Sequence, residues 1–229
     1  MLYYFFDIDG TLLLSGGAGR VAMTQVMKEM FDLDELHRVE VHGRTDRGIV
    51  EELFAKHEIP LDQKRRMEFS DRYHDLLPES MQQCEGVLMP GAVELLEQLS
   101  ELPRVKIGIL TGNSESAAWT KLKHFGLDHF FEFGGFGGNH ALRDDVARQT
   151  LVNCRDTYPN HTIEPTQAWV VGDTVNDITC ARAIGAKVVA VATGGSDMES
   201  LQQHQPDLLL SDLSDHQKFV NATHGSADL

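Results

Sequence analysis

Three polar segments of this sequence each follow a short apolar run, and their residue types suit the chemistry of an anionic substrate and a metal ion. The first is residues 7–11, Asp-Ile-Asp-Gly-Thr, directly after the apolar residues 2–6. Of the two carboxylates, Asp7 and Asp9, both can bind a cation, or one can attack an electrophile while the other transfers a proton. The alternative for this segment alone is an acidic turn that only adds solubility.

The second segment is residues 111–114, Thr-Gly-Asn-Ser, which follow the apolar residues 105–110. The hydroxyl of Thr111, the small Gly112 and the N–H groups of a helix that begins after Asn113 would form a pocket for an anion. Alone this signal is weak, because many turns from a strand to a helix have the same composition.

The third segment is residues 172–177, Gly-Asp-Thr-Val-Asn-Asp, after the apolar residues 168–171. Asp173 and Asp177 are four residues apart, so both face one point if Asp173 caps the helix that holds Asp177. Mg²⁺ prefers hard oxygen ligands of this kind and keeps several waters. The alternative is that Asp173 is an ordinary helix N-cap.

The apolar runs themselves predict the scaffold. Short, uninterrupted apolar runs indicate strands that are buried on both faces. Helical patterns lie between them, and this alternation predicts an α/β fold with a Rossmann-like parallel sheet and helices on both faces. Ligands bind outside the carboxyl ends of such strands, so the three polar segments are expected at one edge of the sheet. The predicted strands are residues 2–6, 105–110, 168–171, 188–191 and 208–210.

Residues 19–84 break the alternation, because they show helical periodicity and no buried strand. We therefore predict an inserted α-helical cap domain, residues 16–85. The core domain is then discontinuous, with residues 1–15 and 86–229 on either side of the insertion. Glycines at positions 16, 17 and 19 provide a flexible entry to the cap.

The bulk composition excludes several classes of protein. A formal net charge of −15 opposes binding to nucleic acid and to anionic membranes, and no stretch approaches the ~20 apolar residues of a membrane span. The 3 cysteines form no Cys-x-x-Cys pair and the 11 histidines no His-Glu-x-x-His pattern, which favours a cytoplasmic protein with reduced thiols and no zinc site. An acidic chain that binds a phosphate ester must supply local positive charge from a metal ion, backbone N–H groups and a few Lys or Arg.

In combination, the three segments resemble the motifs of the haloacid dehalogenase superfamily, whose members are mostly Mg²⁺-dependent phosphatases. The resemblance covers nearly the whole core and points to phosphoglycolate phosphatase-like members, and the helical insertion is similar to the family's type 1 cap. The family's first motif, Asp-x-Asp-x-Thr, is matched by Asp7, Asp9 and Thr11. Its second motif, a Ser or Thr after an apolar strand, is matched by Thr111. Its fourth motif, Gly-Asp-x-x-x-Asp, is matched by Gly172, Asp173 and Asp177.

The resemblance implies a role for each matched residue. Asp7 would attack phosphorus and form an aspartyl-phosphate. Asp9 would protonate the leaving oxygen and then activate the water that releases phosphate. Thr111, with the adjacent Gly112 and Asn113, would bind the phosphoryl group. Asp7, the backbone carbonyl of Asp9 and Asp173 would bind Mg²⁺. Asp177 would be a further Mg²⁺ ligand or a hydrogen-bond acceptor beside the site.

One departure from the family pattern concerns the third motif, usually a Lys followed by Pro. The corresponding residues 134–145 contain no Lys. Arg143 stands at a suitable spacing before a helical pattern, and we predict that its guanidinium supplies the missing positive charge to the phosphate and to Asp7. The alternative is that Arg143 is a surface residue and that His140 or a distant Lys serves instead.

The predicted cap holds one more candidate, a glycine-containing turn at residues 42–46. A similar loop in family members with this cap lies over the active site and helps to select the substrate. Arg44 would then meet the anionic end of a substrate. The alternative is that Thr45 or Asp46 merely caps a helix and that Arg44 is solvated.

The leading hypothesis is a Mg²⁺-dependent phosphatase for a small-molecule phosphate ester, such as a phosphoglycolate-like compound or a sugar phosphate, acting as a monomer or homodimer. A phosphomutase of the beta-phosphoglucomutase kind shares the same motifs. A true dehalogenase is disfavoured, because those members lack an acid at the position of Asp9. A non-catalytic binding protein on the same fold is the alternative from another class.

Overall fold

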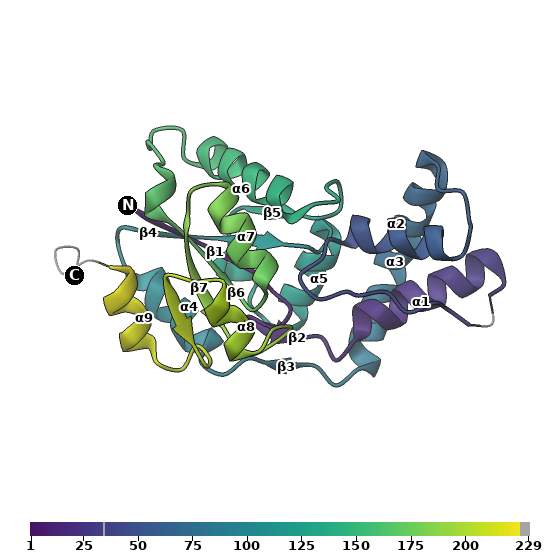
Figure 1. Cartoon of the computed structure of the whole chain (residues 1–229), viewed down its shortest axis with the longest axis horizontal. Helices are drawn as coiled ribbons and strands as arrows, with labels where there is room; N and C mark the ends of the chain where they lie inside the picture. Colours follow the sequence, from purple (N-terminus) through teal and green to yellow (C-terminus); the bar gives the residue numbers. More distant parts are fainter. Residues whose placement is uncertain (34, 225–229) are drawn as a thin grey trace.

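The computed structural model describes residues 1–33 and 35–224. Its centre is a six-stranded sheet in the order β5-β4-β1-β6-β7-β8, in which all neighbouring strands are parallel. The predicted Rossmann-like fold is therefore confirmed (Figure 1). The strands are β1 (Leu2–Phe6), β4 (Val105–Thr111), β5 (Gly134–Phe136), β6 (Ala168–Gly172), β7 (Lys187–Val191) and β8 (Leu208–Leu210).

The aromatic strand β1 lies in the middle of the sheet because its side chains fill both faces. Tyr4 and Phe6 belong to the apolar cluster on one face, and Tyr3 and Phe5 to the cluster on the other. The first face is covered by α4 (Ala92–Glu101), α5 (Glu115–His124) and α9 (His216–Thr223). The second is covered by α6 (Arg143–Thr157), α7 (Val175–Ala183) and α8 (Met198–Gln203).

The strand order reverses at β1, which pairs with β4 on one side and with β6 on the other. From β1 the chain runs outward through β4 to β5, and later outward in the opposite direction from β6 to β8. Such a switch point opens a crevice at the carboxyl ends of the central strands, where ligands bind in open α/β sheets. All three polar segments of the sequence follow these three strands.

Three helices form a part of their own beside the sheet: α1 (Ala18–Phe31), α2 (Asp46–Lys56) and α3 (Gln63–Gln83). They enclose a separate apolar cluster and extend away from the carboxyl edge of the sheet (Figure 1). A two-stranded antiparallel ribbon, β2 (Leu13–Leu14) and β3 (Val87–Leu88), joins the entry and exit of this helical part. The proposed domain boundaries, after residues 15 and 85, lie next to this ribbon and stay a prediction.

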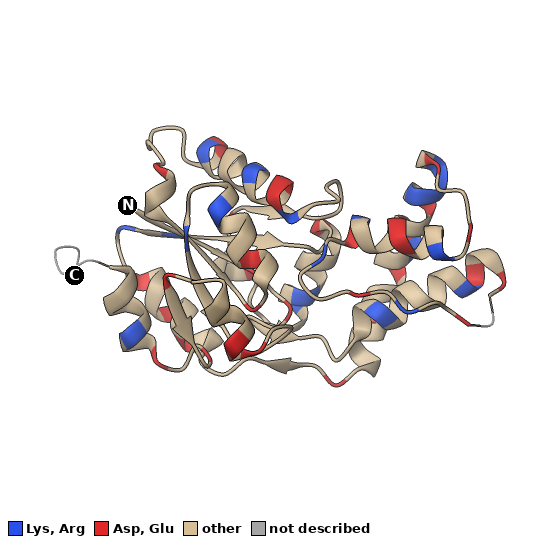
Figure 2. Cartoon of the chain, viewed as in Figure 1, with Lys and Arg blue, Asp and Glu red and all other residues tan. Residues whose placement is uncertain are grey.

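Charged residues of both signs are spread over the whole chain (Figure 2). Lys and Arg occur on α1 and α5 and on the loop before α2, near the junction between the helical part and the sheet (Figure 2). Among the described helices, none combines the length and the apolar composition needed to cross a membrane. The other elements in the described part of the chain are two short 3₁₀ helices, Asp128–Phe130 and Pro165–Gln167.

Candidate active site

Asp7, the predicted nucleophile, directly follows β1 at the switch point of the sheet. Its backbone N–H donates to the carbonyl of Val171 at 2.9 Å, so the backbone at Asp7 is still held by β6. The residue is only 5% exposed. Burial raises the pKa of the Asp7 carboxyl to about 6, against the opposing effect of the nearby Arg143 guanidinium.

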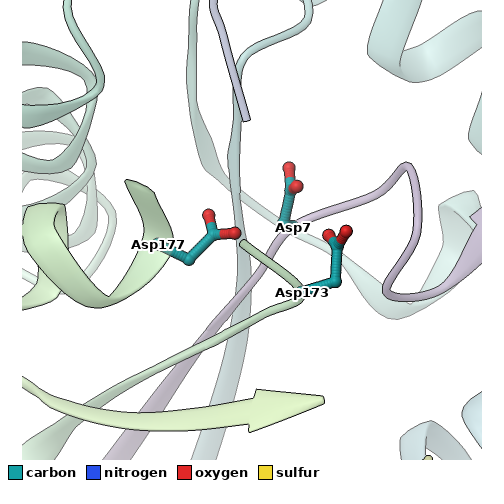
Figure 3. Close-up of side chains that lie close together, drawn as sticks. All are labelled: Asp7, Asp173 and Asp177. Atoms are coloured by element: carbon teal, nitrogen blue, oxygen red, sulfur yellow. The ribbon is translucent and has the colours of Figure 1, made fainter. Parts of the chain in front are cut away.

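Three carboxylates gather at this point, from Asp7, Asp173 and Asp177, and one oxygen of each lies within 4.8 Å of the others. Figure 3 shows the side chains converging from the end of β1, the loop after β6 and the start of α7. Thr11 Oγ1 (3.2 Å) and the backbone N–H of Gly195 (2.5 Å) donate to the two carboxylate oxygens of Asp173. Burial, followed by repulsion from the other two carboxylates, raises the pKa of Asp173 to about 8.

The start of α7 differs from the arrangement expected from the sequence, in which Asp173 caps the helix. The N-cap is Thr174, and Asp177 completes a capping box. Oδ2 of Asp177 accepts from the backbone N–H of Thr174 at 3.0 Å and from its Oγ1 at 2.7 Å. Asp173 is thereby free of the capping task, and its carboxylate points toward Asp7 instead.

Arg143 is the first residue of α6 and is 6% exposed. Nη1 donates to Oδ1 of Asp7 at 3.3 Å, and Nη2 donates to the carbonyl of Leu110 at 3.4 Å and to Oδ1 of Asp177. Burial opposes the charged form, but the carboxylates of Asp7 and Asp177 hold the pKa of Arg143 above its usual range. Among the described residues, Arg143 is the cation that contacts Asp7.

Asp9, the predicted proton-transfer group, has a side chain that is 34% exposed. Its Oδ2 accepts from Lys121 Nζ at 2.5 Å and from Asn113 Nδ2 at 2.8 Å, and its Oδ1 accepts from Ser15 Oγ at 3.1 Å. Burial alone would raise the pKa of Asp9, but the Lys121 ammonium and these hydrogen bonds lower it below its usual value.

Lys121 is the residue of this site that the sequence did not identify. It comes from α5, three and four residues after the buried Ala118 and Ala117, and therefore faces inward. This helical spacing was a usable signal, because a lysine on an apolar helix face needs a partner. A distant Lys thus does reach the site, although it contacts Asp9 and not Asp7.

Thr111, at the end of β4, is fully buried, and its Oγ1 accepts from Asn113 Nδ2 at 2.8 Å. Gly112 next to it lies against the backbone of Arg44, where a Cβ atom would collide with the Arg44 carbonyl oxygen. The backbone N–H of Ser114, at the start of α5, donates to Oδ2 of Asp46 at 2.7 Å. Part of the anion pocket expected at this helix start is thus taken by a carboxylate of the helical part.

The loop before α2 holds the helical part against the sheet. Thr45 Oγ1 donates to the Ala141 carbonyl at 3.0 Å and also caps α2 by accepting from Gly48 N. On the other side, Asn176 Nδ2 donates to the Gly43 carbonyl at 2.9 Å. These contacts lie on both sides of the carboxylates, so the helical part covers the site.

Arg44, predicted to meet the substrate, lies in the same loop and lines the cavity below it. Its guanidinium pairs with Glu52 and donates to the carbonyl oxygens of Gly48 at 3.1 Å and Glu40 at 3.3 Å. The cavity has a volume of roughly 430 Å³ and reaches from Asp7 to α1 and α3. Asp9, Thr111, Gly112, Asn113 and Arg143 also line it, together with Arg20, Met23, Tyr73 and Lys121.

The comparisons with known proteins agree with this geometry. A family model described as haloacid dehalogenase-like hydrolase matches residues 4–191. A phosphoglycolate phosphatase of Chromobacterium violaceum is 30% identical over 205 residues, which cover 86% of this chain and 87% of that protein. One from Synechococcus elongatus is 30% identical over 218 residues and 92% of each chain.

Solved structures agree on the fold. CbbY from Rhodobacter sphaeroides, in complex with phosphate, superposes with a TM-score of 0.73 at 17% identity and covers 94% of this chain and 96% of its own. With the family match and the curated relatives, the predicted family and the predicted enzyme class, a phosphatase, are confirmed. The chain belongs to the haloacid dehalogenase-like hydrolases.

Proposed function

We propose that the protein is a Mg²⁺-dependent phosphatase that hydrolyses a small-molecule phosphate monoester through an aspartyl-phosphate at Asp7. The observation that carries the proposal is the placement of Asp7. It lies at the switch point of the sheet, beside a buried guanidinium and two further carboxylates, and it lines a partly open cavity. Electrostatic stabilisation and positioning are the main requirements of phosphoryl transfer, and this site offers both.

The residues fit a divalent cation. Among the described residues, three buried carboxylates face one guanidinium at this point, and burial together with their mutual repulsion raises the pKa of Asp7 and Asp173. Asp7 and Asp173, with the backbone carbonyl of Asp9, would hold Mg²⁺, and Asp177 would support them through Arg143 and Thr174. Bound Mg²⁺ would supply positive charge that offsets the repulsion between carboxylate and phosphate.

The chain's own residues then divide the reaction into two steps. In the first, a carboxylate oxygen of Asp7 forms a bond to phosphorus while the bond to the leaving oxygen breaks, and that oxygen takes a proton from Asp9. In the second step, a water molecule attacks the same phosphorus and gives a proton to Asp9. The bond between the Asp7 oxygen and phosphorus breaks, and phosphate leaves. The lowered pKa of Asp9 suits the second step, in which it accepts a proton, and the negative charge of a bound phosphate would raise that pKa for the first.

The phosphoryl oxygens have donors on two sides. Arg143 contributes its guanidinium, and Thr111 contributes its hydroxyl at the end of β4, where Asn113 Nδ2 donates to Oγ1 and so leaves the hydroxyl hydrogen free for the phosphoryl group. Gly112 allows the covering loop to lie directly above them. These residues would hold the phosphoryl group in line with Asp7, and the loop would exclude bulk water during the first step.

The substrate class is a phosphate ester with a second acidic group, as in phosphoglycolate. Two curated relatives are named phosphoglycolate phosphatase, which supports this choice. The cavity offers Arg20, whose exposed guanidinium has no hydrogen-bond or ion-pair partner among the described residues. Arg44 stays a predicted contact for the same group, although Glu52 already pairs with it. A cytoplasmic location and a monomer or homodimer also stay predictions.

A panel of phosphorylated metabolites, including 2-phosphoglycolate and sugar phosphates, tests the function with Mg²⁺ and with EDTA. We expect Mg²⁺-dependent phosphate release that Asp7→Asn abolishes and the exposed Asp71→Asn preserves. Acid-quenched wild-type enzyme should carry a phosphoryl group on the peptide that contains Asp7. No release from any substrate, or release by Asp7→Asn, would contradict the proposal, and an isomeric product without free phosphate would indicate a phosphomutase.

A further inference from the structure

Among the described residues, Lys121 is the only lysine that is buried, with 4% exposure. Lysine is almost never buried without a partner, because its ammonium loses hydration. The side chain leaves α5 and reaches the wall of the cavity. It passes Gly19 at the start of α1, where a Cβ atom would stand 3.8 Å from Nζ, an ordinary contact distance, so the ammonium lies close to the helical part.

The ammonium and the amide of Asn113 act on the same oxygen of Asp9. Lys121 Nζ donates to Asp9 Oδ2 at 2.5 Å and to Asn113 Oδ1 at 2.6 Å, and Asn113 Nδ2 also donates to Asp9 Oδ2 at 2.8 Å. The three side chains therefore form a closed triangle of hydrogen bonds. Because Asn113 also donates to Thr111 Oγ1, this triangle is tied to the phosphate-binding end of β4.

The two oxygens of the Asp9 carboxylate are consequently not equivalent. A carboxylate has about four lone-pair sites, two on each oxygen. Oδ2 already accepts two hydrogen bonds, from Lys121 and Asn113, whereas Oδ1 accepts one, from Ser15 Oγ at 3.1 Å. Oδ1 is the oxygen with capacity left for a proton that comes and goes.

We propose that Lys121 is a positioning residue, which with Asn113 fixes Oδ2 of Asp9 and so directs Oδ1 toward the leaving-group oxygen. The inference rests on the proposed function, in which Asp9 transfers the proton. In the first step the O–H bond at Oδ1 breaks and the proton joins the leaving oxygen as its bond to phosphorus breaks. In the second step Oδ1 takes a proton from the attacking water. Without Lys121 the carboxylate can rotate, and proton transfer loses its geometry.

The experiment compares two leaving groups with Lys121→Met. The alkoxide of 2-phosphoglycolate, or of the alkyl phosphate that the wild type hydrolyses fastest, needs a proton as it departs, whereas p-nitrophenolate departs without one. The ratio kcat/KM reports only on steps up to this departure. We expect Lys121→Met to lower kcat/KM for the alkyl phosphate by on the order of 100-fold, as for the loss of a general acid, and for p-nitrophenyl phosphate by less than about threefold.

Two further variants complete the test. Lys123→Met removes the same charge from an exposed position of the same helix and should leave kcat/KM for both substrates unchanged. Lys121→Arg retains a donor and should restore about tenfold of the lost alkyl phosphate activity, and it keeps the test usable if the methionine variant does not fold. Equal losses for both substrates, or no loss, would overturn the positioning role alone. Inactivity of the wild type on both substrates would instead contradict the proposed function, and the inference with it.

Discussion

Arg143 contacts Asp7 through Nη1 and Oδ1, 3.3 Å apart, although 136 residues separate the two in the chain. The same guanidinium also donates to Asp177, so one planar fork spans two carboxylates of the cluster. The family pattern has a lysine in this segment, and a lysine ammonium is a point charge without such a fork. Arg143 thus combines the charge expected there with a bond that orders Asp177.

Arg143→Ala should lower kcat/KM by on the order of 100- to 1000-fold, the usual cost of removing a donor to the transition-state charge. Arg143→Lys should recover part of this loss, because it restores the charge but cannot bond Asp7 and Asp177 with one rigid group. Steady-state kinetics with the best substrate of the panel measures both. Arg148→Ala, an exposed position of the same helix, is the control. Unchanged turnover in Arg143→Ala would refute the role of Arg143.

The sequence could predict most of the sheet because its central strands are buried on both faces and therefore uninterruptedly apolar. The strand β5 is different. Gly134 and Gly135 carry no apolar side chains, so nothing in the sequence pattern marks them. A glycine is needed at position 135 for lack of space, because a Cβ atom there would collide with Thr150 of α6, which packs against this strand.

Some of the site residues could likewise be predicted from the sequence, and others could not. Asp7, Thr111 and Asp173 were predictable, because each follows a recognisable apolar strand and parallel strands bring their carboxyl ends together. For Lys121 the helical spacing could indicate an inward-facing side chain but not its partner Asp9, and the position of Asp46 depends on where the helical part lies. Asp46 reaches the N–H of Ser114 only across the junction between the two parts.

The acidic cluster also predicts how metal binding depends on pH. The pKa of Asp7 is raised from 3.8 to about 6 and that of Asp173 to about 8. From about pH 4 to about pH 8, the folded protein therefore binds more protons at these groups than the unfolded chain, and their contribution to stability falls as pH rises. A cation that replaces those protons should bind more tightly as pH rises.

Thermal unfolding should therefore show a rise in Tm on addition of Mg²⁺ that is small near pH 5 and larger near pH 8, because ligand binding to the native state alone is stabilising. Asp173→Asn removes one of the two carboxyls whose pKa is raised and should abolish the Mg²⁺-dependent rise in Tm at every pH. Asp71→Asn, at an exposed site, should retain it. A Mg²⁺ effect independent of pH, or one that survives in Asp173→Asn, would contradict the assignment of the cluster as the metal site.

Arg20 and Arg44 both line the cavity, but they differ in what already holds them. Arg44 pairs with Glu52 and donates to two backbone carbonyls. Arg20, on α1, has no such partner among the described residues and is exposed. An arriving carboxylate would have to displace Glu52 to bind Arg44 in the same geometry, whereas Arg20 is available at once.

Arg20→Met should therefore raise KM for 2-phosphoglycolate by about tenfold, the loss of one charge-assisted hydrogen bond, and leave kcat nearly unchanged because Arg20 does not contact the reacting atoms. Ethyl phosphate, which lacks the carboxylate, provides the matched substrate, and its KM should not change. Lys28→Met, at an exposed position of the same helix, controls for the loss of positive charge from α1. Equal rises in KM for the two substrates would mean that Arg20 attracts the phosphate and does not recognise the second acidic group, and the choice between the two arginines would then fall to Arg44.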